Sequence, residues 1–192
     1  KFRFRRDNGD QRPFRQRAMP NLAAALTAEA LRLAPPDENA GPAGPADPDA
    51  LATAACAVLR RRRVMIKTVS DPWQAGSHPI RTAAGLLDAR TGSVLDIAVL
   101  LAGVLERLGV AATLLLTSTT VLVGYRRRGR EGRAPASPQE AADLIRRGVM
   151  GMIDPRLAVG AAVAVLHGLP GRARGVALEA LSDLTLAVPV GA

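Results

Sequence analysis

A glycine turn followed by a strongly amphipathic run decides the fold, and residues 90–109 read RTGSVLDIAVLLAGVLERLG. The run predicts a helix over 93–108 with one buried face, because its apolar residues recur at spacings of three and four. Ser93, followed three residues later by Asp96, predicts a box-like N-cap, and Gly109 predicts the helix end. The predicted buried stripe consists of Val94, Ile97, Ala98, Leu101, Val104, Leu105 and Leu108, with Asp96, Gly103, Glu106 and Arg107 off it.

The segments before this run are mostly helical in pattern. Helices are predicted over 22–33 and 50–62, the second capped by Asp49, and a Pro/Gly-rich internal loop over 35–49 separates them. A short strand or extended segment is expected over 64–70, a loop over 71–79, and a short helix from Thr82.

The segments after the run change period. Residues 111–117 and 120–126 are β-rich and predict neighbouring strands, and 149–154 and 184–190 are further strand candidates. A Ser-x-x-Glu box predicts a helix over 137–148, and 157–167 (helix or loop) and 173–182 (helix) are the remaining expectations. Helices first, then a central helix, then strands is an α+β order.

The length of 192 residues suits one domain, 21–192, preceded by a basic extended arm over 1–20. The chain begins at Lys1 rather than Met, which is compatible with a fragment or one region of a longer polypeptide. A single cysteine, Cys56, excludes an internal disulfide and is compatible with a reducing cytoplasm. Two histidines at no recognised ligand spacing predict no metal site, and we expect no cofactor and no membrane span.

The net charge of +9 has two interpretations. Basic runs at 1–6, 59–63 and 125–133 could bind phosphates, whereas the interpretation we favour is an Arg-rich solvated surface, since little aromatic interleaving supports base stacking. The candidate phosphate-binding residues are Arg60, Arg61, Arg62, Arg63, Arg126, Arg127 and Arg128.

Four short motifs follow one another in an order that resembles a known family. They are Met-Pro-Asn at 19–21, Ile-Arg-Thr at 80–82, Gly-Ser-Val-Leu-Asp at 92–96 and Thr-Thr-Val-Leu-Val-Gly at 119–124. Together they resemble the transglutaminase-like branch of the papain-like fold, in the bacterial version found in the N-terminal region of large, often helicase-associated multidomain proteins. That version typically has Gly-Thr-Cys-Leu-Asp and Gly-His-Ala-Phe-Val-Gly at the last two places. The resemblance covers about 19–160 and implies a central helix packed on a small antiparallel sheet, with N-terminal helices.

The chemistry of that family needs a thiolate at a helix start, an imidazole that activates it and a carboxylate that orients the imidazole. The resemblance assigns these places to Val94, Thr120 and Asp154, so that the cysteine and the histidine are both replaced. Asp154 is either a retained carboxylate or a turn residue that ends a strand. The resemblance therefore implies a pseudoenzyme.

Three functions remain open from the sequence. The leading hypothesis is an inactive transglutaminase-like domain that serves as a scaffold or protein-interaction module, for a partner or for other domains of its own polypeptide. The resemblance extends this to a bacterial assembly, with antiphage defence as its suggested setting. The alternatives are a basic nucleic-acid-binding accessory module and a residual hydrolase or acyltransferase that uses Ser93, although a helix cap explains Ser93 better.

Overall fold

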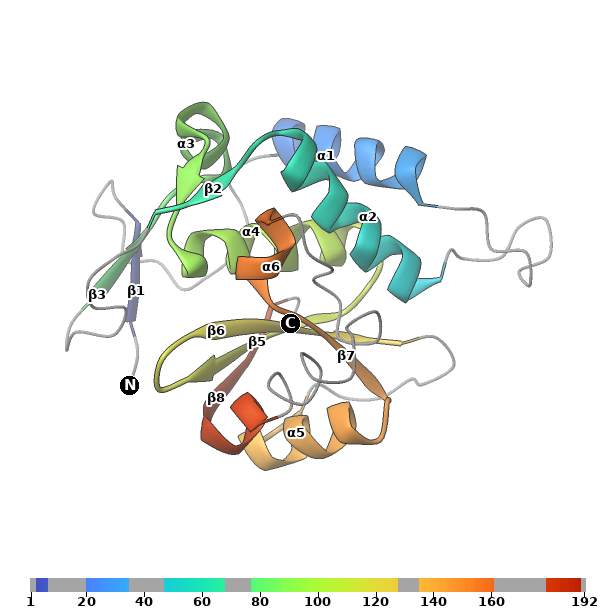
Figure 1. The fold of residues 1–192 in the computed structure, drawn as a ribbon, viewed down its shortest axis with the longest axis vertical. Helices are drawn as coiled ribbons and strands as arrows, with labels where there is room; N and C mark the ends of the chain where they lie inside the picture. The colour runs from blue at the N-terminus through green and yellow to red at the C-terminus, as the bar shows by residue number, and fades with distance from the viewer. Residues whose placement is uncertain are drawn as a thin grey trace.

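The computed structural model describes residues 3–6, 20–34, 47–67, 77–127, 135–160 and 179–190. These residues form a mixed α+β structure, as the order of the sequence patterns predicted. Figure 1 shows a sheet between two helical layers, with α1, α2 and α4 above it and α5 below.

The central helix α4 spans Val94–Arg107 and begins with the predicted cap. The Ser93 and Asp96 side chains each bond the other residue's backbone N–H, and the chain leaves the helix through Gly109 at φ +78°. Two residues that lie off the apolar stripe, Asp96 and Gly103, are also buried, and Asp96 is only 5% exposed. A carboxylate can be buried there because its two oxygens accept hydrogen bonds from two backbone N–H groups, those of Arg81 and Ser93.

Four antiparallel strands form the main sheet in the order β7-β6-β5-β8. They are β5 (Ala112–Thr117), β6 (Val121–Arg126), β7 (Met150–Ile153) and β8 (Leu184–Pro189), which confirms the four strand predictions apart from their ends. Successive residues of β5 enter different cores: Leu114 packs in the cluster on the α4 side, and Leu115 in the cluster on the α5 side. Both faces of the strand are covered, which explains why all six of its residues are buried and why three leucines follow one another in it.

The other helices are α1 (Pro20–Leu33), α2 (Pro48–Arg61), α3 (Ala83–Ala89), α5 (Pro138–Arg146) and α6 (Pro155–Val159). The predicted cap of α2 was wrong, because Asp47 and not Asp49 accepts the Ala50 N–H, at 3.1 Å. Pro48 suits the first helical position, so the helix begins earlier than its apolar pattern does. Residues 47–49 therefore belong to the cap and helix rather than to the internal loop.

Two short parallel pairings correct the predicted loops. β1 (Arg3–Arg6) pairs with β3 (Ser77–Ile80), so that the basic arm and the segment 71–79 each contribute a strand. β2 (Met65–Ile66) pairs with β4 (Thr91–Gly92), and of the described residues 64–67 of the predicted segment these two are in a strand. Such pairings join residues far apart in the sequence, and local propensity carries no signal for them.

Several expectations fall outside the described residues. They are the rest of the arm, the loop over 35–46, residues 71–76 with Trp73, and residues 161–178. At the end of the predicted helix 173–182 the chain forms a 3-10 turn, η2 (Ala180–Asp183), where an α-helix was expected. Among the residues described, no helix has the length and apolar character to cross a membrane.

Candidate functional site

The start of α4 carries a hydrocarbon side chain where the resemblance expects a nucleophile. Val94 is the first helical residue. The hydroxyl of Ser93 accepts the Asp96 N–H at 3.1 Å, and the Asp96 carboxylate accepts the Ser93 N–H at 2.8 Å. Its other oxygen accepts the Arg81 N–H at 2.8 Å, which fixes the preceding segment against the helix start. Ser93 therefore acts as a cap, and this helix start offers no thiol or base.

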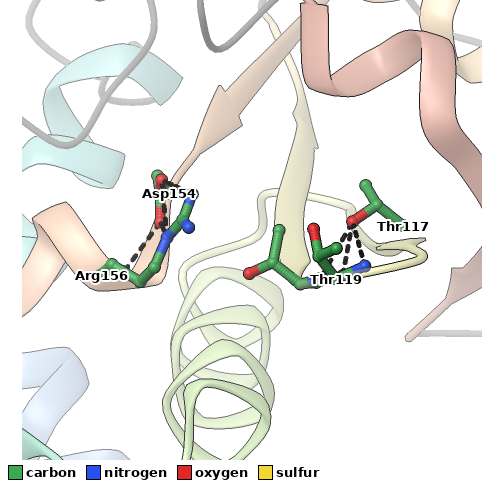
Figure 2. Close-up of polar contacts among 5 residues, drawn as sticks. Thr117, Thr119, Asp154 and Arg156 are labelled. Carbon is green, nitrogen blue, oxygen red and sulfur yellow. Dashed lines mark hydrogen bonds and ion pairs between the residues drawn. The ribbon is translucent and has the colours of Figure 1, made fainter. Parts of the chain in front are cut away.

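The β5–β6 turn carries a cluster of threonines (Figure 2). The hydroxyl of Thr117 accepts the N–H groups of Thr119 at 3.3 Å and Thr120 at 3.0 Å, and donates to the Thr120 carbonyl at 3.1 Å. The hydroxyl of Thr120, at the expected histidine place, is buried and has no hydrogen-bond partner in the described part of the chain. Thr117 thus stabilises the turn through its hydroxyl, whereas the hydroxyl of Thr120 forms no hydrogen bond with a described residue.

Asp154 caps α6 and is held by its own turn. Its side chain accepts the Arg156 N–H at 2.9 Å, and the Arg156 guanidinium pairs with it at 2.6 Å. This hydrogen bond raises the pKa of Arg156 despite the burial that opposes it. In Figure 2 the dashed lines from Asp154 lead only to Arg156, and none joins it to the threonine turn. The geometry is that of a turn residue at a strand end.

The three places assigned by the resemblance therefore share no hydrogen bond among the described residues. The Val94 side chain cannot form a hydrogen bond. The Thr120 hydroxyl has no partner among the described residues, and Asp154 forms an ion pair with Arg156. The histidine side chains, at 78 and 167, lie outside the described part. No proton relay is formed by the groups that are described.

A polar cluster that the sequence did not suggest joins α2 to the sheet. Asp49 accepts the phenol O–H of Tyr125 at 2.8 Å and pairs with the Arg127 guanidinium, which also donates to the Gly148 carbonyl at 3.2 Å. Burial, reinforced by the Asp49 carboxylate, raises the pKa of Tyr125. The sequence signals were an acid near a helix start, which we predicted to be a cap, and Arg127 in a basic run, and no local pattern joins the two.

Cys56 is fully buried in α2, and burial raises the pKa of its thiol to about 12. A neutral thiol is neither a nucleophile nor a metal ligand near neutral pH. Among the described residues, no group of three or more His, Cys, Asp or Glu side chains could hold a metal ion.

The predicted phosphate-binding arginines differ in their contacts and exposure. Arg60 donates to the Ala158 carbonyl at 3.3 Å, Arg62 pairs with Glu29 at 2.7 Å, and Arg127 pairs with Asp49. Arg61 and Arg63 are exposed and form no ion pair with the described residues. Arg126 ends β6 half-buried, and Arg128 lies outside the described part.

Comparison of the chain with protein-family models, with curated proteins and with solved structures found no match.

Proposed function

We propose that this chain is a catalytically inactive transglutaminase-like domain, which serves as a scaffold or protein-interaction module within a larger assembly. The observation that carries the proposal is Val94 at the first position of α4. In the family that the motifs resemble, this position holds the thiol, because the N–H groups and dipole of the helix start favour a thiolate there. A valine has no atom that can attack a carbonyl.

The other two places support the same proposal. Thr120 offers a buried hydroxyl instead of an imidazole, and Asp154 is occupied by Arg156 at 2.6 Å. A carboxylate held in this way is not available to orient a base from β6. Repairing the chemistry would therefore need changes at all three places, which favours retention of the fold for binding over residual catalysis.

The faces of β5 and β6 that pack against α4 do not serve as this binding surface in our proposal. The side chains of β5 and β6 that face α4 are buried in the core shared with that helix. Leu114, Val121 and Val123, for example, are at most 1% exposed. A partner therefore binds to the outer surfaces of the layers, and the sheet acts as the rigid support for them.

Chemical probes test the loss of catalysis. Wild-type protein is expected to remain unlabelled by a fluorophosphonate at Ser93. It should also remain unlabelled by iodoacetamide at pH 8, because Cys56 is buried with its pKa raised to about 12. Fluorophosphonate labelling that disappears in Ser93→Ala would overturn the inactive assignment. Because Cys56 is not expected to react with iodoacetamide, alkylation of an engineered cysteine can be measured without interference.

Restoring the triad tests the family geometry. In the variant Val94→Cys/Thr120→His/Arg156→Gln, the thiol pKa read from the pH dependence of alkylation is expected below about 7.5, against about 8.5 for an unassisted thiol. Val94→Cys alone and Pro138→Cys, a cysteine at the first position of α5 after its own serine cap, are the matched controls. If the pKa of the restored thiol equals that of both controls, α4 and β6 do not form the family's site.

A further inference from the structure

Four exposed cations lie within four residues of the short β2–β4 pair, in the segments that enter and leave it. They are Arg61, Arg63, Lys67 and Arg90, and we call them the basic ribbon patch. The pairing brings them together: Met65 N–H donates to the Arg90 carbonyl at 2.9 Å, and Lys67 N–H donates to the Gly92 carbonyl at 2.8 Å. Only Arg61 and Arg63 were candidates from the sequence, since Arg90 comes from a distant segment.

No described residue neutralises the patch. None of its four cations forms an ion pair with a described residue. Among the described residues that flank the patch in sequence, one exposed acid, Asp88 on α3, lies two residues from Arg90. Asp71, four residues after Lys67, lies outside the described part of the chain. Met65, 61% exposed, is the large apolar side chain between the cations. A single apolar residue is too small a face for insertion into a lipid surface.

Two of these arginines occupy a backbone conformation that other residue types adopt more easily. Arg63 has φ +55° and Arg90 has φ +51°, each just after a helix, where glycine or asparagine is usual. The left-handed region is strained for residues with a Cβ. At its two other described left-handed positions, 109 and 148, the chain uses glycine. Arginine therefore stands at 63 and 90 at a cost in stability, and that strain points to a use for the side chain.

We infer that the basic ribbon patch binds the phosphate backbone of nucleic acid without sequence preference. Guanidinium groups pair with phosphate oxygens through two hydrogen bonds, and four neighbouring cations give the multiple contacts that such binding needs. This surface is separate from the three triad places, so the inference does not depend on the inactive transglutaminase-like assignment.

Glycine substitution distinguishes a binding role from a structural one. Arg63→Gly/Arg90→Gly removes two charges and relieves the backbone, so Tm is expected to stay equal or to rise by about 2 °C. Affinity for a fluorescein-labelled mixed-sequence 20-nucleotide single-stranded DNA at 50 mM salt is expected to fall about 10- to 100-fold. The slope of log affinity against log salt should become shallower by about 1.4, for two lost contacts at about 0.7 each. A fall in Tm without loss of affinity would overturn the inference.

A charge-matched pair controls for net charge. Arg61→Glu/Lys67→Glu should abolish binding to the same DNA. Arg146→Glu/Arg147→Glu makes the same change on exposed residues at the C-terminal end of α5 and should weaken binding less than threefold. Equal losses in the two pairs would mean general attraction by the basic chain and would refute a localised site. Binding to a DNA duplex of the same sequence and to vesicles with 30% phosphatidylserine is measured as well. Binding to vesicles but to neither DNA would assign the patch to a membrane surface and overturn the inference.

Discussion

At the scale of single residues, neighbouring side chains of one type have opposite roles. The hydroxyl of Thr117 makes three hydrogen bonds within the β5–β6 turn, whereas that of Thr120 is buried and has no partner in the described part of the chain. A buried hydroxyl without a partner loses its hydration and gains nothing in return. The sequence could not separate these two residues, since both are threonines in a β-rich run.

Valine substitutions should therefore have opposite effects at these two positions. Thr117→Val is expected to lower the free energy of unfolding by about 1–3 kcal/mol, because two N–H groups lose their acceptor. Thr120→Val should leave it unchanged or raise it, because a methyl group replaces an unpaired hydroxyl. Urea unfolding of both variants measures this. A comparable loss for Thr120→Val would show that its hydroxyl has a partner after all.

At the scale of elements, the approach of β7 to β6 depends on a missing side chain. Tyr125 and Gly151 are cross-strand partners, and a Cβ on Gly151 would lie 2.1 Å from the Tyr125 ring. The ring therefore lies across the glycine while its hydroxyl reaches Asp49. The strand prediction for 149–154 was confirmed, but a glycine in a strand pattern does not say which ring it makes room for.

Gly151→Ala is expected to lower the free energy of unfolding by about 3 kcal/mol, because the ring cannot shift without breaking its bond to Asp49. In the background of Tyr125→Leu the same change should cost clearly less, and a double-mutant cycle measures the difference. Gly85→Ala, with 3.3 Å to the Thr82 hydroxyl in the exposed helix α3, is the control and should stay within about 1 kcal/mol of the wild type. Simple additivity in the cycle would contradict the proposed packing.

At the scale of the whole molecule, the helical layer and the sheet each contain a buried group that loses its proton only at a raised pH. Cys56 in α2 has its pKa raised to about 12, and burial also raises the pKa of Tyr125 in β6. Both groups stay protonated in the folded protein at pH values where an unfolded chain ionises them, at about 8.5 for Cys and about 10 for Tyr. Their contribution to stability is complete below about pH 8.5 and is lost as the pH rises.

The free energy of unfolding should therefore fall between pH 9 and 11, by up to about 1.4 kcal/mol per pH unit for each group. Cys56→Ala is expected to flatten the slope between pH 9 and 10, leaving the Tyr125 contribution at higher pH. Urea midpoints at pH 8, 9, 10 and 11 for both proteins test this. An unchanged slope in the variant would mean that the Cys56 thiol is not protected from ionisation.

The sequence by itself determined what depends on neighbours along the chain. The α4 stripe, its Ser93 cap and Gly109 stop, and the α+β order of helices and strands were all predictable, because each rests on helical period, capping or alternation within one segment. The tertiary structure alone decided which polar groups meet. Asp49 with Arg127, Asp96 with Arg81 and the basic ribbon patch around Arg90 join residues far apart in the sequence. Their partners are set by packing and strand pairing, and no local pattern records those contacts.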